Sequence, residues 1–327
     1  MKKIKLLNLG GTITSVRDPK TGGLRSGSLT GEELIEQSGL GSLNLNLDIE
    51  NFKSLPSTEI SLEDLREVKA RIDEIISQGE FEGIVITHGT DTMEETAYML
   101  NLIVDAKIPI VMTGSQRSIK DLGFDGSGNI RDAIIVASDN ASQGKGVLLV
   151  FNQEILPAKF AFKSNSTGLR GFTAQGTGPL GNVYGGEANY YYDISPNKTL
   201  EILDKPFTNK VYLFKMALDY PIDIIEAAIE NSCDGIVLEG FGIGAVTPDT
   251  QDVLEKAISK GIPVVLTTRS ETGGVRALYA SKGAGVQLKD LGVIFESEIS
   301  GVKARLKLIA LLNSRFKNEL EEHWLEY

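Results

Sequence analysis

The stretch Gly83-Ile84-Val85-Ile86-Thr87-His88-Gly89-Thr90-Asp91-Thr92-Met93-Glu94-Glu95 decides the fold of this chain. It begins with a short, mostly apolar run, which is typical of a strand covered on both faces of a parallel sheet. Gly89 allows a turn, and Thr92 with Glu95 forms a Thr-x-x-Glu capping box that predicts a helix over residues 92–105. The stretch therefore predicts one strand–turn–helix unit of an α/β fold.

The same alternation of apolar strands and amphipathic helices extends along the chain in both directions. Strands are expected at residues 3–9, 83–87, 109–113, 146–152, 211–215, 235–239 and 263–267, and further helices at 61–79, 129–138, 222–232, 250–260 and 301–313. Repeated βα units of this kind predict a doubly wound sheet. We expect a two-domain α/β protein: a larger N-terminal domain over 1–188 with a doubly wound, mostly parallel sheet, a linker over 189–209, and a smaller parallel α/β domain over 210–327.

Length and composition exclude several classes of protein. A chain of 327 residues corresponds to about two domains, and 41% hydrophobic residues suffice for ordinary cores. The formal net charge of −11 argues against nucleic acid and anionic membranes as partners. No apolar stretch approaches the ~20 residues of a transmembrane helix, and no secretory apolar segment follows the first lysines, so a cytoplasmic location is expected.

Cysteine and histidine are rare in this chain. Cys233 is the single cysteine, and His88 and His323 are the two histidines. One cysteine excludes an intramolecular disulfide framework, and a cysteine–histidine zinc cluster needs more ligands than the chain contains. A zinc cluster of this kind is therefore excluded.

The first expected strand ends in Gly10-Gly11-Thr12. Two glycines permit positive φ angles and a close approach of a ligand to the backbone. Thr12 then lies at the carboxyl edge of the sheet, where its hydroxyl could act as a nucleophile if a base took its proton. A plain tight turn, with Thr12 as a capping residue, is the other interpretation.

The segment His88-Gly89-Thr90-Asp91-Thr92 admits two interpretations as well. Backbone amides at the helix start could bind a carboxylate, and Asp91 could hold an ammonium group. Alternatively, Thr92 and Asp91 cap the helix, and His88 is a buried, hydrogen-bonded side chain.

Lys163 lies in the alternating stretch Lys159-Phe160-Ala161-Phe162-Lys163. A lysine in such a stretch usually belongs to a solvated face. A lysine that is partly desolvated or lies beside another cation can lose its proton and act as a base.

Several of these motifs together resemble the bacterial-type L-asparaginases. They are Gly10-Gly11-Thr12-Ile13, the string from Ile86 to Thr96, and Lys163-Ser164-Asn165; residues 113–117, 128–133 and 234–244 also look like landmarks of the family. The resemblance spans nearly the whole chain. It implies two α/β domains and hydrolysis of L-asparagine to aspartate and ammonia without a metal, so we expect neither a metal ion nor a cofactor. It also implies a homodimer or homotetramer in which a neighbouring subunit completes each active site.

The resemblance also implies roles for the catalytic residues. Thr12 corresponds to the threonine that attacks the side-chain amide carbon. Thr90, Asp91 and Lys163 correspond to a Thr–Lys–Asp relay, in which Asp91 also binds the α-amino group of the substrate.

The substrate-binding residues follow from the same match. Ser57 corresponds to the serine that binds the substrate carboxylate, with Thr58 beside it, and Ser115 to a residue whose backbone lies near the leaving amide. A carboxamide is a poor electrophile, so an oxyanion must be stabilised, and backbone amides around Gly11 and Gly89 suit that task.

Two departures from the family pattern affect the mechanism. The loop over 15–28 is rich in glycine, as a closing lid would be, but contains no tyrosine to contact the nucleophile. Three groups therefore remain as candidates to take the proton of the Thr12 hydroxyl: Thr14, a bound water and Lys163. The segment 240–245 also lacks an asparagine that some members present to the neighbouring site.

Three other functions compete with the hydrolase. Gly240-x-Gly242-x-Gly244 after a strand could belong to a dinucleotide-dependent enzyme, but the fingerprint lacks its third glycine and the acid ~20 residues on. A two-lobed amino-acid binding protein is the second alternative. Such proteins are usually exported, and this sequence shows no secretory apolar segment after its first lysines. A subunit of a transfer-RNA-dependent amidotransferase is the third alternative. Such subunits resemble the same family but carry an extra N-terminal domain, and the net charge of −11 disfavours transfer RNA as a partner. We expect hydrolysis of L-asparagine, with L-glutamine as a poorer substrate.

Overall fold

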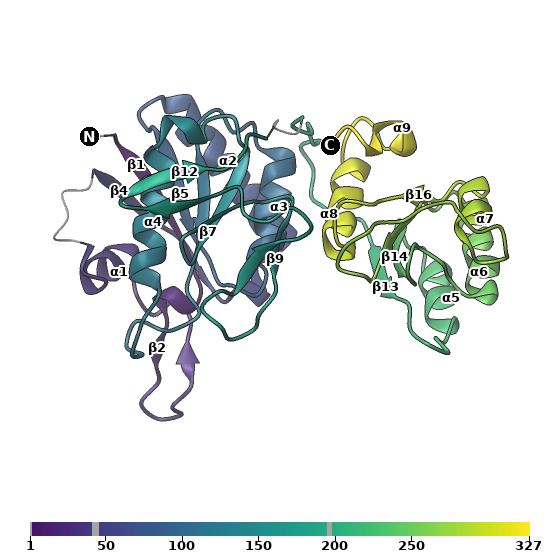
Figure 1. Ribbon diagram of the computed structural model, residues 1–327, viewed down its shortest axis with the longest axis horizontal. Helices are drawn as coiled ribbons and strands as arrows, with labels where there is room; N and C mark the ends of the chain where they lie inside the picture. The colour runs from purple at the N-terminus through teal and green to yellow at the C-terminus, as the bar shows by residue number, and fades with distance from the viewer. Residues whose placement is uncertain (1, 41–45, 195–197) are drawn as a thin grey trace. The chain divides into compact units, whose positions relative to one another are not determined.

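The structure is a computed structural model that describes residues 2–40, 46–194 and 198–327. The chain divides into two compact units, Met1–Thr199 and Leu200–Tyr327, which we call the N-terminal unit and the C-terminal unit (Figure 1). None of the described helices is long and apolar enough to cross a membrane.

The N-terminal unit is built on an eight-stranded mixed sheet in the order β12-β11-β8-β7-β6-β5-β1-β4. Five neighbouring strands are parallel: β4 (Leu47–Leu55), β1 (Ile4–Gly10), β5 (Gly83–Thr87), β6 (Ile110–Thr113) and β7 (Val147–Phe151). Their carboxyl ends therefore meet at one edge of the sheet, as the sequence predicts.

Three antiparallel strands extend this sheet: β8 (Glu154–Pro157), β11 (Gly181–Tyr184) and β12 (Glu187–Tyr190). The expected linker at 189–209 thus begins inside a strand, because residues 189 and 190 pair with β11. Two small hairpins lie outside the sheet, β2 (Val16–Arg17) with β3 (Leu24–Arg25) and β9 (Ala161–Lys163) with β10 (Phe172–Ala174).

Helices cover both faces of the parallel strands. The helices of this unit are α1 (Gly31–Gln37), α2 (Leu62–Gln78), α3 (Met93–Ile103) and α4 (Gly126–Ser138). α4 packs on β5, β6 and β7, and its Ile130 and Ala133 share one core with Val111 and Leu148 of the sheet. α3 contacts β6, β7 and α2. The strands β1, β5, β6 and β7 are buried along their whole length, which explains their continuous apolar sequence.

The start of α2 confirms one predicted capping box, and the start of α3 contradicts the other. Ser61 accepts a hydrogen bond from the N–H of Asp64, whose carboxylate accepts from the N–H of Ser61. Partial burial raises the pKa of Asp64, but hydrogen bonds from Lys53 and Ser61 outweigh it and lower that pKa to about 2. Thr92 occupies the N-cap of α3 without a capping hydrogen bond, so its predicted role as a cap is wrong.

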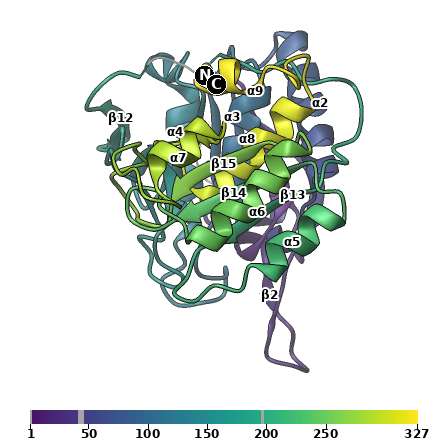
Figure 2. The same ribbon diagram turned by 90° about the vertical axis from the view of Figure 1, so that its right-hand side faces the viewer.

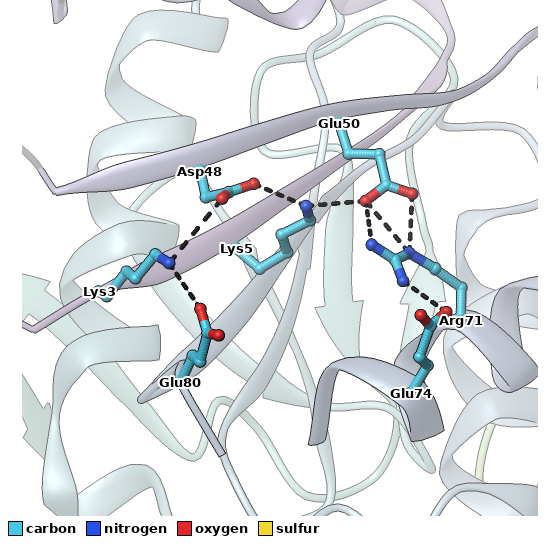
Figure 3. A network of polar contacts seen from close by, with 7 residues as sticks. All are labelled: Lys3, Lys5, Asp48, Glu50, Arg71, Glu74 and Glu80. Carbon is cyan, nitrogen blue, oxygen red and sulfur yellow. Dashed lines mark hydrogen bonds and ion pairs between the residues drawn. The ribbon is translucent and has the colours of Figure 1, made fainter. Parts of the chain in front are cut away.

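Charged side chains fasten the edge strand β4 to β1 and α2 (Figure 3). Lys5 of β1 has only 7% of its side chain exposed and lies 2.6 Å from Asp48 and 2.8 Å from Glu50 of β4. Arg71 of α2 reaches the same Glu50 at 2.8 Å. The two carboxylates outweigh the effect of burial and raise the pKa of Lys5, so this lysine is a charged link between the strands.

The C-terminal unit holds a parallel sheet in the order β13 (Val211–Lys215), β14 (Gly235–Gly240), β15 (Val264–Thr268) and β16 (Ile294–Phe295). The connecting helices α5 (Asp223–Glu230), α6 (Pro248–Ser259) and α7 (Gly285–Asp290) share one apolar core on the sheet, and α8 (Gly301–Leu312) packs against β13, β14 and β15 (Figure 2). Trp324 of α9 (Leu320–Trp324) is buried and donates to Glu296 at 2.9 Å.

Candidate active site

The loops that follow β1, β4 and β5 meet at the carboxyl edge of the N-terminal sheet. A Cβ atom built on Gly11 would lie 2.3 Å from the backbone nitrogen of Gly89, and one built on Gly89 would lie 2.8 Å from the Ser57 Oγ. The loop after β6 adjoins them, because a Cβ on Gly114 would lie 2.4 Å from the His88 carbonyl oxygen. Segments up to about a hundred residues apart in sequence thus form one cluster.

Thr12 begins a 3-10 turn, Thr12–Thr14, directly after the glycine pair. Gly10 and Gly11 have φ angles of +100° and +90°, which only glycine adopts without strain. The Thr12 side chain is half-buried, and its hydroxyl makes no hydrogen bond within the described part of the chain. The expected nucleophile is therefore not committed to a structural contact.

The neighbouring hydroxyls differ from Thr12. Thr14 and Ser15 are buried, and both donate to the carbonyl of Gly11, at 3.2 Å and 2.8 Å. The Thr14 hydroxyl thus donates its hydrogen to the backbone and supports the turn around Thr12.

Lys163 lies at the centre of a compact polar cluster. Its Nζ donates to the Thr90 Oγ1 at 2.8 Å and lies 2.6 Å from the Asp91 Oδ1. The Lys163 side chain is only 15% exposed and Thr90 is buried, whereas the Asp91 side chain is 65% exposed. The structure therefore brings the three predicted relay residues together and leaves one carboxylate facing solvent.

Two residues that sequence reasoning missed hold the Lys163 segment in place. The buried Glu94 accepts a hydrogen bond from the backbone N–H of Lys163 at 2.5 Å. Gln116, next to Ser115, donates to the carbonyls of Asn165 and Gly168 at 3.2 Å and 3.1 Å. Both residues lie inside motifs that carry the resemblance, the string from Ile86 to Thr96 and residues 113–117, and this position was the available signal.

Ser57 and Thr58 occupy the 3-10 turn Ser57–Glu59 after β4. Ser57 is 4% exposed and its Oγ faces Gly89, whereas Thr58 is exposed. The Thr92 hydroxyl donates to the Ser57 carbonyl at 2.7 Å. Thr92 does not cap α3, and its φ of −118° and ψ of 17° differ from the extended backbone of a capping residue. Ser57 thus belongs to the cluster around the two glycines.

Ser115 is buried, and its hydroxyl donates to the carbonyl of Arg117 at 2.6 Å. Asp125 holds the same loop by accepting from the backbone N–H groups of Gln116 and Arg117, each at 3.0 Å. The Ser115 hydroxyl is thus engaged within its own loop.

His88 is fully buried, and this desolvation lowers its pKa to about 4, although the carbonyl of Gly89 acts in the opposite direction. One ring nitrogen lies 2.6 Å from that carbonyl oxygen and the other 3.1 Å from the Thr96 hydroxyl. A neutral ring that donates to Gly89 and accepts from Thr96 satisfies both contacts. The interpretation of His88 as a buried, hydrogen-bonded side chain is therefore confirmed.

The glycine-rich loop after Thr12 forms the β2–β3 hairpin, which projects from the N-terminal unit (Figure 1). Arg17 forms an ion pair with Asp121 at 3.0 Å, and Ser26 accepts from the backbone N–H of Gly11 at 3.1 Å. The hairpin base is thus tied both to the loop after β6 and to the glycine pair.

The glycines of segment 240–245 form a tight turn that ends before α6 begins at Pro248. The backbone N–H of Phe241 donates to the carbonyl of Ala245 at 2.7 Å, and Gly242 has a φ of +49°. A Cβ atom on Gly240 would lie 2.9 Å from that Ala245 oxygen. The turn packs on its own backbone, which disfavours the dinucleotide interpretation.

One group of side chains in the described ranges has the spacing of metal ligands. Ligand atoms of Glu319, Glu322 and His323 lie within 4.8 Å of one another. The two carboxylates are exposed, and His323 already lies 3.3 Å from Glu319. Since the group belongs to the C-terminal unit, the cluster around Lys163 does not include it.

Comparisons with known proteins agree with this geometry. Residues 3–196 match the family model "Asparaginase, N-terminal" and residues 210–324 match "Glutaminase/Asparaginase C-terminal domain". The chain is 37% identical to an L-asparaginase of Bacillus licheniformis, over 96% of each chain. It is 30% identical to L-asparaginase 2 of Escherichia coli, over 100% of this chain and 94% of that protein.

A solved structure supports the same assignment. The crystal structure of a probable cytoplasmic L-asparaginase from Campylobacter jejuni matches with a TM-score of 0.88 and 26% identity, and the match covers all of both chains. Because the two family models cover both units and the sequence relatives cover nearly the full length, this chain belongs to the asparaginase family.

Proposed function

We propose that this protein is an L-asparaginase, which hydrolyses L-asparagine to L-aspartate and ammonia and acts on L-glutamine more slowly. The observation that carries the proposal is the contact of Lys163 with Thr90 and Asp91. Thr90 and Asp91 belong to the loop after β5, which packs against the glycine pair before Thr12. Membership of the asparaginase family supports the substrate.

The site suits a zwitterionic amino acid. Asp91 is exposed and can hold the α-ammonium group of the substrate by a charge-assisted hydrogen bond. The Ser57 hydroxyl, with Thr58 beside it, and backbone amides at the start of α3 can bind the α-carboxylate. Asp91 thus binds the positive group and the hydrogen-bond donors bind the negative group, so the site selects a ligand that carries both charges.

The Thr12 hydroxyl is the nucleophile in this proposal. Its oxygen attacks the side-chain carbonyl carbon, and negative charge develops on the carbonyl oxygen. The N–H of Gly89 has no acceptor in the described part of the chain and is the better candidate for an oxyanion donor. The N–H of Gly11 already donates to Ser26. The backbone after β6, at Ser115, lies beside the leaving amide.

Covalent catalysis then divides the reaction into two steps. The tetrahedral intermediate collapses by breaking the C–N bond, and ammonia leaves with the proton that came from Thr12. Water attacks the resulting ester, which releases L-aspartate and returns a proton to Thr12. We assign the proton transfer to the Thr90–Lys163–Asp91 relay, in which the Lys163 Nζ contacts both the Thr90 hydroxyl and the Asp91 carboxylate.

Ammonia release from L-asparagine and L-glutamine tests the proposal. We expect Thr12→Ala to lower kcat by at least a thousandfold and Lys163→Met by about a hundredfold or more, because each removes a participant in bond making or proton transfer. Thr177→Ala, which removes an exposed hydroxyl, is the matched control. Wild-type turnover in the Thr12→Ala protein would refute the mechanism.

We also propose a homodimer or homotetramer with active sites near the subunit interfaces, and a cytoplasmic location. The solved relative is described as probably cytoplasmic, whereas a related protein of Haemophilus influenzae is described as probably periplasmic. Sedimentation equilibrium of the full chain measures the assembly, and cell fractionation measures the location. A monomer that is fully active at nanomolar concentration would contradict the shared site.

A further inference from the structure

Helix α3 begins with two polar side chains that reach away from the helix. The Thr92 hydroxyl donates to the Ser57 carbonyl at 2.7 Å, 35 residues away in sequence. The Glu94 carboxylate accepts from the backbone N–H of Lys163 at 2.5 Å, 69 residues away. An N-cap threonine normally accepts from the helix that it starts, but Thr92 makes no such bond, and its hydroxyl donates to the distant Ser57 carbonyl.

These contacts end on two different parts of the proposed site. Ser57 belongs to the donors for the substrate carboxylate, and Lys163 belongs to the proton relay. Thr90 and Asp91 lie directly before the same helical turn. One turn of α3 therefore touches the binding side through Thr92 and the relay side through Glu94.

Both partners need support from outside their own segments. The β9–β10 hairpin that carries Lys163 pairs only three residues per strand, and a two-stranded hairpin is marginal by itself. Ser57 sits in a single 3-10 turn after the edge strand β4. Glu94 is buried, so water competes little for its hydrogen bond to the hairpin.

We propose that the first turn of α3 is a brace with two separable effects, in which Thr92 and Glu94 are positioning residues. Thr92 fixes Ser57 for substrate binding, and Glu94 fixes the backbone of Lys163 for turnover. This inference rests on the proposed asparagine hydrolysis. Neither side chain contacts the reacting atoms, so each effect is indirect.

The Thr92 half is tested with Thr92→Val, which keeps the shape and removes the hydroxyl, and Thr92→Ser, which keeps the hydroxyl. Loss of one net hydrogen bond corresponds to about twofold to tenfold in an equilibrium constant. We expect Thr92→Val to raise KM for L-asparagine and Kd for L-aspartate by about that factor, with kcat within about twofold. Thr92→Ser is expected to restore both constants.

The Glu94 half is tested with Glu94→Ala, which removes the acceptor, and Glu94→Gln, which keeps an acceptor oxygen without the charge. We expect Glu94→Ala to lower kcat by about tenfold or more, with KM within about threefold, since a misplaced relay group slows the reaction without weakening binding. Glu94→Gln is expected to retain an intermediate kcat, and it serves as the test if Glu94→Ala does not fold.

The pattern across the variants decides the proposal. A wild-type enzyme without ammonia release from L-asparagine refutes the proposed function. An active wild type in which Thr92→Val and Glu94→Ala change kcat and KM by the same factors refutes the brace. The brace also fails if Thr92→Ser is as impaired as Thr92→Val, because the hydroxyl would then be unimportant. Thermal unfolding by circular dichroism confirms that each variant is folded at the assay temperature.

Discussion

Gly11 and Gly89 let the loops after β1 and β5 lie in van der Waals contact beside Thr12. Neither position has room for a side chain, since a Cβ atom on either one would lie within 3 Å of heavy atoms of a neighbouring loop. Gly11 also has a φ of +90°. The resemblance explains why these residues recur in the motif, and the structure adds the physical reason, which is backbone-to-backbone packing at the nucleophile.

Gly11→Ala is expected to reduce both stability and activity. The positive φ and the overlap with Gly89 together should lower the free energy of unfolding by about 2–3 kcal/mol, and the displaced Thr12 should lower kcat at least tenfold. Gly22→Ala is the control, because Gly22 has a φ of +71° but open space around its Cβ position. Urea unfolding and ammonia release measure both effects. Equal losses in the two variants would mean that backbone strain alone is responsible.

His88 makes stability depend on pH in a defined window. Its pKa is about 4 in the folded protein and 6.5 ordinarily, so the unfolded chain binds a proton first as pH falls. The stability from a neutral His88 is therefore fully present above about pH 6.5 and is lost as pH falls toward 4. A shift of this size corresponds to about 3 kcal/mol.

Comparison with His88→Gln isolates this contribution. Glutamine can replace the hydrogen bonds to Gly89 and Thr96 but does not titrate. We expect the difference in unfolding free energy between wild type and variant to shrink by about 3 kcal/mol between pH 7 and pH 4. A difference that stays constant over that range would show that His88 is not the group responsible.

At the scale of secondary structure, burial decided which elements could be predicted. The strands at the centre of the N-terminal sheet read as continuous apolar runs because helices cover both faces. β4 was missed because it is an edge strand whose residues, such as Asp48 and Glu50, are half-exposed and charged. α1 was missed because it has only seven residues.

Contacts between distant segments could likewise not be predicted from the sequence. Thr92 satisfies the local pattern of a capping box, but its hydroxyl donates to the distant Ser57 carbonyl and accepts no bond from the first turn of α3. The contact of Glu94 with the Lys163 backbone joins segments whose pairing depends on the folded sheet. The motif match predicted the members of the relay, and only the fold supplies the side chains that hold them.

The start of α2 provides a test of true capping. Ser61→Ala removes the acceptor for the N–H of Asp64 and should lower the free energy of unfolding by about 1 kcal/mol. Ser77→Ala near the end of the same helix removes a hydroxyl that only donates to a backbone carbonyl, and it should cost less than about 0.5 kcal/mol. Chemical denaturation of both variants measures the contrast. Indistinguishable values would argue against the capping box.

At the scale of the whole molecule, each of the two units provides its own signal for following unfolding. Trp324 is the single tryptophan, is 1% exposed and belongs to the C-terminal unit. All the proposed catalytic residues belong to the N-terminal unit. Fluorescence and activity therefore follow different parts of the chain during unfolding.

A pair of core variants tests whether the units unfold separately. Leu238 of β14 and Leu148 of β7 are both fully buried, and replacing either by alanine should cost its own unit about 2–5 kcal/mol. We expect Leu238→Ala to lower the urea midpoint of Trp324 fluorescence. Leu148→Ala should lower the midpoint for loss of activity and leave the fluorescence midpoint in place. Equal shifts of both midpoints in both variants would show that the units unfold as one.

The ion pairs that fasten β4 have a consequence beyond holding two strands together (Figure 3). β4 ends the sheet, and the unpaired backbone groups of such a strand are a template on which another chain can add a strand. Lys5, Asp48 and Glu50 place charges along this border, and an added strand would have to strip water from those that remain partly exposed. Charges along an edge strand therefore oppose the edge-to-edge addition of a second chain.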